Sequence, residues 1–154
     1  MPPASGFDID DSLWPLLIVR FVGAPSLDDL EGYLAKRLVY LQRYQPHVLV
    51  YDARETRMFS NALIQRHVAW SKQHEALRRR TVLASAVVVT SPLIRMAAST
   101  LLHFLPSKTP SRFCASVPEA VNWLADWLHK EGHLVQANRA RQRFGVGPGW
   151  RNVT

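Results

Sequence analysis

The chain has 154 residues, the usual length of one domain, and 47% hydrophobic with 20% charged residues is an ordinary globular composition. A single cysteine, Cys114, excludes an internal disulfide. The first eleven residues carry Asp8, Asp10 and Asp11 where a signal peptide needs basic and then apolar residues. Arg95 and His103 interrupt the apolar run 90–105. We therefore expect a cytoplasmic protein with no transmembrane segment.

The formal net charge of +7 is concentrated at the C-terminal end. Residues 133–154 contain no acidic residue and four arginines: Arg139, Arg141, Arg143 and Arg151. Because the rest of the chain is nearly balanced, the sequence disfavours nucleic acid as the partner of the body and leaves the first three of these arginines as a weak polyanion-binding segment.

The first part of the chain predicts a hairpin, a helix and a buried strand. Residues 6–10 and 13–22 are strand-like and are separated by the turn sequence Asp10-Asp11-Ser12. A helix begins at the capping residue Ser26 and carries leucines at spacings of three and four. The β-branched run 47–52 (HVLVYD) then predicts a buried strand.

The second part predicts three more helices and two strands. In order, they are a helix from Ser60 or Asn61 to about Arg80, a central strand 81–90, a helix from Ser91-Pro92 to near Pro106, a strand 112–115 and a helix from Ser116 to Gly132. This order indicates an α/β fold with a mixed, mostly parallel sheet of about five strands and four main helices. No apolar periodicity follows, so we expect one α/β domain over residues 1–132 and a flexible basic extension over 133–154.

Several local sequences carry a resemblance to a known family. They are the Gly23 turn, the strand VLVYDARE, the helix with Trp70, the segment AVVVTSPLIR and the closing PEAVNWL. Together, over residues 6–130, they resemble the SpoIIAA-like branch of the STAS and SEC14-like domains. The resemblance implies a single STAS-like domain but not one function, because this architecture serves regulators, transporters and lipid carriers.

Ser60 is the residue to which the resemblance gives a role. In anti-sigma-factor antagonists of this family, a Ser or Thr at the start of the helix after the buried strand is phosphorylated, and the new charge switches partner binding. The family has an acidic residue, hydroxyls and a glycine there, whereas this chain reads Met58-Phe59-Ser60-Asn61-Ala62. Ser60 is therefore a candidate phosphoswitch by resemblance and a plain helix N-cap by position.

No group of residues predicts catalysis, a metal site or a cofactor. His67 and His74 would lie about 10 Å apart along one helix, which is too far for one zinc ion without a third element. Cys114 lies in the last predicted strand, where a free cysteine is usually a small buried hydrophobe. We expect a protein that is not an enzyme.

Asp52, Arg54 and Arg57 follow the carboxyl end of the buried strand. Sheets of α/β proteins commonly present ligand-binding groups at this end. The three residues are thus a candidate polar site, and the alternative is an ion-pair cluster on the surface.

The helix from Pro92 to Leu105 is more apolar than contact with one sheet requires. Its polar residues form a single stripe of Arg95, Ser99 and His103. The candidate contact surface for a partner or ligand comprises Leu93, Arg95, Met96, Leu101, Leu102 and Phe104. We expect Leu101 and Leu102 on the outward side. Burial between the sheet and a neighbouring helix is the alternative.

The leading hypothesis is a non-enzymatic regulatory or scaffolding module that binds a protein partner, including a second copy of itself, through this helix. The alternative is a small carrier of a lipid-like or other apolar ligand beneath the same helix. A weaker alternative is an adaptor for nucleic acid or an anionic surface through the basic tail. A pocket of several hundred cubic ångströms would favour the carrier, and a flat exposed patch would favour the module.

Overall fold

The computed structural model describes residues 5–105 and 109–147. Its centre is a five-stranded sheet with the order β1-β2-β3-β4-β5. The strands are β1 (Gly6–Leu13), β2 (Leu16–Gly23), β3 (His47–Thr56), β4 (Val82–Val88) and β5 (Ser111–Cys114). β1 runs antiparallel to β2, and the other neighbours are parallel. The mixed, mostly parallel sheet expected from the sequence is confirmed, with β4 in its interior.

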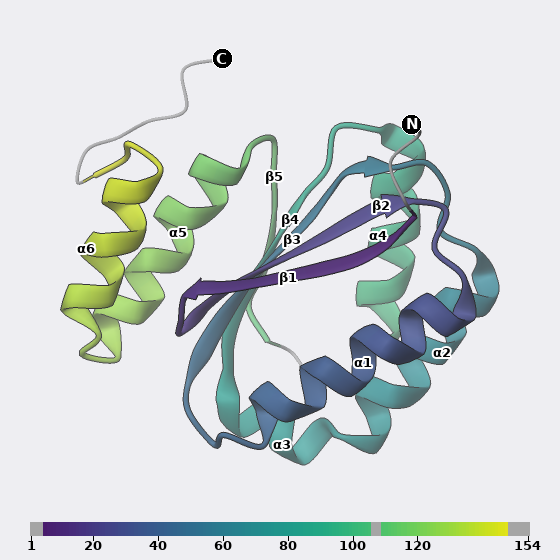
Figure 1. The fold of residues 1–154 in the computed structure, drawn as a ribbon, viewed down its shortest axis with the longest axis horizontal. Helices are drawn as coiled ribbons and strands as arrows, with labels where there is room; N and C mark the ends of the chain where they lie inside the picture. Colours follow the sequence, from purple (N-terminus) through teal and green to yellow (C-terminus); the bar gives the residue numbers. More distant parts are fainter. Residues whose placement is uncertain (1–4, 106–108, 148–154) are drawn as a thin grey trace.

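Six helices lie within the described residues, two more than expected. They are α1 (Leu27–Leu41), α2 (Asn61–Gln73), α3 (Glu75–Thr81), α4 (Pro92–Phe104), α5 (Val117–Lys130) and α6 (Leu134–Arg143). Helices α1 to α4 cover one face of the sheet, and α5 and α6 cover the other (Figure 1). The result is a three-layer α/β domain.

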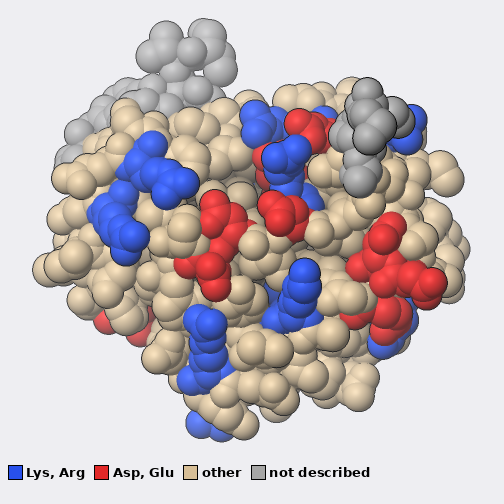
Figure 2. Space-filling view, viewed as in Figure 1, with Lys and Arg blue, Asp and Glu red and all other residues tan. Residues whose placement is uncertain are grey.

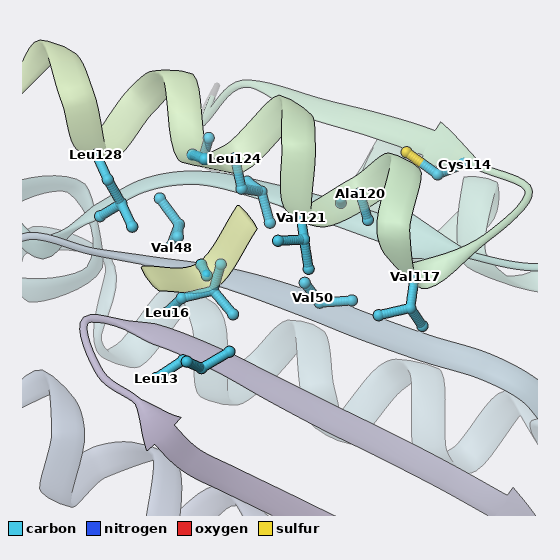
Figure 3. Close-up of a cluster of buried hydrophobic side chains, with 14 of the residues drawn as sticks. Leu13, Leu16, Val48, Val50, Cys114, Val117, Ala120, Val121, Leu124 and Leu128 are labelled. Carbon is cyan, nitrogen blue, oxygen red and sulfur yellow. The ribbon is translucent and has the colours of Figure 1, made fainter. Parts of the chain in front are cut away.

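Each face of the sheet has its own core because strand side chains alternate between the two faces. Val48 and Val50 of β3 point toward α5 and pack with Val121 and Leu124 (Figure 3). Leu49, between the two valines, belongs to the opposite core, against α1 and α2. Since β3 and β4 are buried on both faces, their apolar runs are nearly continuous, as the sequence indicated.

Helix α6 shows that the expectation of a flexible extension from residue 133 was wrong for residues 134–143. Ala137 and Ala140 are fully buried in the core beneath α5, and Phe144 packs against the same core. Arg141 is also buried, and its Nε donates a 3.1 Å hydrogen bond to Asn122. The buried face is built from alanines, which are weak signals of periodicity. Residues 148–154 of the expected extension lie outside the described residues.

Several boundaries differ from the sequence-based expectation; for example, β3 runs on to Thr56, four residues beyond the expected end. The hairpin turns at Trp14-Pro15, because β1 continues through Asp10–Ser12 with an irregular register and reaches Leu13. The helix expected over 60–80 is broken at His74, whose φ of −110° and ψ of 22° leave the helical range. Thr81 ends α3, so β4 begins one residue later, at Val82.

Basic and acidic side chains are interspersed on the face shown in Figure 2. Of the arginines proposed to bind polyanions, Arg139 and Arg143 are exposed, whereas Arg141 forms an ion pair with Asp126. The surface in this view has no continuous basic stripe of the kind that follows a nucleic-acid backbone. None of the helices in the described part of the chain is long and apolar enough to span a bilayer.

Candidate functional site

Helix α4 buries few of its side chains against the rest of the protein. It begins where Ser91 caps it, the Ser91 side chain accepting a hydrogen bond from the backbone N–H of Ile94, and Pro92 occupies its first turn. Of its residues, only Ile94 is buried. An apolar helix with one buried residue leaves most of its surface for other contacts.

Three large apolar side chains are exposed on the outward side of α4, which also carries the exposed polar residues Ser99, Thr100 and His103. Leu93, Met96 and Phe104 have exposed fractions of 68%, 67% and 57%. These residues recur at spacings of three and eight, so they share one face of the helix. Arg95 is also exposed, and its guanidinium lies 4.6 Å from the ring centre of Phe113. These four residues of the predicted contact surface are therefore accessible.

Leu101 and Leu102 lie on the other side of α4, which corrects the expectation that they face outward. Both are half-buried and line a cavity beneath the helix. They fall one and two turns after Ala97, Ala98 and Ile94, so the rotation of the helix turns all five residues toward the sheet. The apolar surface of α4 is thus divided between a side that lines the cavity and a side that is exposed.

The cavity lies between α4, α2 and the sheet and has a volume of about 510 Å³. Its apolar lining comes from the strands, from the loop that precedes α2, and from α4 with the residue after it. These residues are Phe21, Ala53, Phe59, Val82, Val87, Ile94, Ala97, Ala98, Leu101, Leu102 and Leu105. The strand residues alternate with those that face α5, so the pleat of the sheet directs them here. The size is that of a small-molecule site.

Polar groups line another part of the same cavity. Arg78 and His67 are 6% and 5% exposed. Tyr51 of β3 contributes its phenol, and Ser85 and Ser111 contribute hydroxyls that lie 3.1 Å apart. Arg78 lies in the last turn of α3, where its carbonyl accepts a hydrogen bond from the N–H of Val82, the first residue of β4. The cavity therefore has an apolar lining with a few convergent polar side chains.

A second buried arginine lies behind this wall. Arg37 of α1 is 1% exposed, and its Nη1 donates hydrogen bonds to the phenol oxygens of Tyr33 at 3.1 Å and Tyr51 at 2.7 Å. Its guanidinium also lies 5.6 Å from the ring centre of Trp70. Within the part of the chain that the structure describes, Nε and Nη2 of Arg37 have no hydrogen-bond partner.

Burial and the two arginines control the ionisation of this cluster. Burial, followed by the charges of Arg37 and Arg78, lowers the pKa of His67 to about 3. Burial raises the pKa of the Tyr33 phenol and lowers the pKa of Arg78. At neutral pH the histidine and this phenol are uncharged, so the charge of the cluster is positive.

Sequence reasoning missed this cluster, although a signal was present. Arg37 lies three residues after Leu34 and four before Leu41, on the apolar stripe of α1. Arg78 likewise follows His67 and His74 at helical spacing. A charged residue on a buried stripe marks a special site, because isolated charges are costly to bury.

Of the candidate polar site at Asp52, Arg54 and Arg57, the first two residues form an ion pair. The guanidinium of Arg54 donates to both carboxylate oxygens of Asp52, at 2.9 and 2.8 Å. Arg20 pairs with the nearby Glu55 at 2.8 Å. Arg57 is exposed, and its backbone N–H donates to the carbonyl of Gly23. The three residues do not line the cavity.

Ser60 caps α2. Its side chain accepts a 3.2 Å hydrogen bond from the N–H of Leu63, and the residue is half-buried. The hydroxyl thus has a structural role at the position where the resemblance places a phosphorylated residue.

The remaining candidates for chemistry are structural. Cys114 is buried, and burial raises the pKa of its thiol to about 11. The ring of His74 packs against Trp70 at 5.1 Å between ring centres. The described residues hold no group of three or more His, Cys, Asp or Glu side chains that could bind a metal ion.

Comparisons with known proteins identify the architecture. No family model matches the chain, and no curated protein matches it. Among solved structures, an uncharacterised protein of the DUF3478 family with a SpoIIAA-like fold, from Shewanella loihica PV-4, matches with a TM-score of 0.60 and 19% identity over 80% of this chain and 98% of that chain. The chain has a SpoIIAA-like fold.

A second solved structure with this SpoIIAA-like fold is an anti-sigma factor antagonist from Mycobacterium paratuberculosis. It matches with a TM-score of 0.53 and 11% identity, over 80% of this chain and 98% of that chain. The fold implied by the sequence resemblance is confirmed. Similarity at these identities establishes the architecture, and the function has to be argued from the residues of this chain.

Proposed function

We propose that this protein is a cytoplasmic, non-enzymatic regulatory module that binds a protein partner through the outward face of α4. The observation that carries the proposal is the exposure of Leu93, Met96 and Phe104 on a helix that buries only Ile94. Large apolar side chains grouped on one exposed helix face are typical of interaction sites. The same fold in an anti-sigma factor antagonist supports a regulatory role.

The partner that fits this face is a protein with an apolar groove and an acidic rim. Arg95 is exposed on the same helix, on the side toward Phe113, and Asp and Glu are absent from Pro92–Phe104. A groove that binds an amphipathic helix commonly contacts helix residues at spacings of three, four and seven. A second copy of this chain is the alternative partner, because an isologous α4–α4 contact would cover the same residues. The test must distinguish this homodimer from a complex with a different protein.

Chemistry on a substrate has no support in the described residues. The thiol of Cys114 is buried with a raised pKa, and the carboxylate of Asp52 is engaged by Arg54. His67 is held neutral and is contacted by Ser71 at 3.4 Å, without a carboxylate to orient it. These arrangements favour a binding protein over an enzyme.

The cavity beneath α4 favours a second function, that of a small carrier for an apolar ligand. Its volume of about 510 Å³ lies within the range of small-molecule sites, and most of its lining is apolar. The two functions share α4, whose inner face would contact the ligand while its outer face contacts the partner. A ligand in the cavity would then influence the position of α4 relative to the sheet.

Site-specific photocrosslinking tests the partner-binding function. A photoreactive amino acid in place of Met96 is expected to crosslink one defined protein in the native host, because Met96 lies at the centre of the exposed face. The same amino acid in place of Asn138, which is exposed on α6 at the opposite side of the sheet, is the control. Equal products from both positions, or none from Met96, would contradict the proposed interface.

A further inference from the structure

The cavity beneath α4 carries a pair of serine hydroxyls at one end and a long apolar wall beyond them. We propose that its ligand is a single-chain amphiphile with an uncharged hydroxyl head, which donates a hydrogen bond to Ser85 while the apolar chain lies along the inner side of α4. This inference rests on the carrier function described above, and it specifies the chemical class and the orientation of the ligand.

The direction of α4 defines the two ends of the cavity. Because β4 and β5 are parallel neighbours, α4 returns along the sheet in the direction opposite to β4. Ile94, in the first turn of α4, therefore packs with Val87, near the end of β4. Leu105, directly after α4, and Val82, at the start of β4, line the other end. With a rise of about 1.5 Å per residue, the wall from Ile94 to Leu105 is about 16 Å long.

The serine pair lies toward the end marked by Leu105. Ser85 is aligned with Ser111 of the neighbouring strand, and both line the cavity together with His103, in the last turn of α4. Ser111 and His103 are exposed, whereas Ser85 is only 6% exposed. This end of the cavity therefore reaches the surface, and Ser85 lies inside it. An amphiphile that enters here chain first leaves its head beside the serines.

The hydroxyl protons of the two serines are both engaged within the protein. The Ser111 hydroxyl donates to the backbone carbonyl of Thr109 at 3.2 Å, so the 3.1 Å hydrogen bond between the two serines uses the proton of Ser85. A hydroxyl has one proton and two lone pairs. Within the described residues, the Ser85 oxygen is therefore left as an acceptor with no proton to give. The ligand group that complements it is a hydrogen-bond donor.

This arrangement of protons distinguishes between possible head groups. A carboxylate or an ether presents only lone pairs to the Ser85 oxygen, and a hydrocarbon leaves that oxygen without a donor. A hydroxyl head donates to Ser85 and still accepts hydrogen bonds from water at the surface end. Because a buried polar atom without a partner costs more than one hydrogen bond gains, we expect these head groups to differ measurably in affinity.

The remaining lining fits a hydrocarbon chain. Ile94, Leu101 and Leu102 of α4 face Val87 and Phe21 of the sheet across the cavity. A small polar molecule without a chain would leave this surface in contact with water, whereas a chain removes it from water. A hydroxyl head joined to one chain therefore matches both the serine pair and the apolar wall.

Ligand displacement on the purified full chain tests the inference. The uncharged dye N-phenylnaphthylamine, whose fluorescence rises in an apolar site, serves as the probe. Dodecanol, its methyl ether and dodecanoate are the competitors, all at concentrations below those at which micelles form. Dodecanol and the ether share the chain and the oxygen and differ in the hydroxyl proton, so their comparison isolates donation to Ser85. Dodecanoate tests whether charge selects the head instead.

We expect dodecanol to displace the dye at a concentration about fivefold below that of its methyl ether, as one hydrogen bond can provide. Dodecanoate should also be weaker than dodecanol. Ser85→Ala removes the acceptor and should bring dodecanol to the level of the ether. Ser99→Ala is the matched control, because Ser99 is exposed on α4 and does not line the cavity, and it should retain the preference of the parent.

Ser111→Ala gives a second, opposite test. It removes the group that accepts the Ser85 proton, so Ser85 becomes able to donate to a ligand. The methyl ether should then compete as well as dodecanol, through a gain in the binding of the ether. A general loss of folding would weaken both competitors, so it cannot imitate this result. An unchanged preference for dodecanol in both Ser85→Ala and Ser111→Ala would overturn the proposed contact.

The outcomes separate this inference from the carrier function on which it rests. Equal displacement by dodecanol and the ether in the parent would leave the carrier function standing and refute the hydroxyl head. Stronger displacement by dodecanoate would refute the uncharged head. If the dye does not bind, and titration calorimetry detects no binding of dodecanol, both the carrier function and the inference are refuted. The comparison on the parent needs no substitution, so it decides the question even if a serine variant does not fold.

Discussion

The phenol oxygen of Tyr51 accepts a 2.7 Å hydrogen bond from Nη1 of Arg37, and this bond joins α1 to β3 behind the wall of the cavity. Arg37 is 1% exposed, so the bond is formed away from water. Tyr51 thus serves both the buried arginine and the cavity. Its removal separates the contribution of this contact to folding from its contribution to binding.

Replacement of Tyr51 by Phe is expected to lower the free energy of unfolding by about 1–3 kcal/mol, because the buried guanidinium loses an acceptor. Tyr40→Phe is the control, since the Tyr40 hydroxyl contacts Asp11 in an exposed position. That change should cost less than about 0.5 kcal/mol. Urea unfolding of the parent and both variants gives the comparison. Equal losses in the two variants would show that the Arg37–Tyr51 bond contributes nothing special.

The stability of the protein should fall with pH on the acid side of neutrality. The pKa of His67 is about 3 and that of His47 about 4, both lowered chiefly by burial from a value of 6.5. Between pH 6.5 and about 4, the unfolded chain binds protons at these residues and the folded chain does not. Each histidine therefore removes up to about 1.4 kcal/mol of unfolding free energy per pH unit.

His67→Gln should reduce that dependence on pH, measured by urea unfolding at several values between pH 6.5 and 5. This interval lies above the range in which most carboxylates titrate. His129→Gln, at an exposed position on α5, should leave the slope unchanged. A parent whose stability is constant across the interval would mean that the buried histidines are protonated in the folded state.

Helix α6 is expected to be part of the folding unit. Ala140→Asp should lower the free energy of unfolding by about 3 kcal/mol or more, because it places an unpaired charge in the core beneath α5. Arg139→Asp, at the neighbouring exposed position, should stay within about 0.5 kcal/mol of the parent. Equal stability of the two variants, measured by thermal unfolding, would indicate that α6 is not docked on α5.

Loss of the cap at Ser60 should lower stability. Ser60→Ala removes the acceptor for the N–H of Leu63 and is expected to cost about 1 kcal/mol, whereas Ser60→Asp retains a capping oxygen and should remain near the parent. As a plain cap, Ser60→Asp should not alter partner binding. A changed affinity for the partner, with stability preserved, would favour the phosphoswitch instead.

The fold was predictable from the sequence where one period dominated. The leucines of α1, the apolar runs of β3 and β4 and the capped α5 each follow a single spacing, so burial and secondary structure agree. The break at His74 was not predictable, because nothing in the sequence interrupts the helical pattern there. Helix α6 was missed because Ala137 and Ala140 pack through their small size and not through hydrophobicity.

The candidate site was only partly predictable. The sequence identified α4 as unusually apolar, and Leu93, Met96 and Phe104 are exposed as a contact surface requires. The orientation of Leu101 and Leu102 was wrong, since an apolar helix does not reveal which side meets the sheet. The cavity depends on the gap between α2 and α4, a tertiary feature. Arg37 and Arg78 lie at helical spacing from residues of the buried helix faces, but they were not identified from the sequence as a buried cluster.

The central claim is that the outward face of α4 binds a protein. The most direct test is to measure the dissociation constant for the protein that is crosslinked when a photoreactive amino acid replaces Met96. We expect Met96→Glu to raise the dissociation constant at least about tenfold, because a charge cannot be buried unpaired in an apolar contact. Asn138→Glu introduces the same charge on α6 and should leave it unchanged. If the partner is a second copy, the same comparison is made on the dimer by light scattering. Equal dissociation constants for the parent, Met96→Glu and Asn138→Glu would contradict the claim.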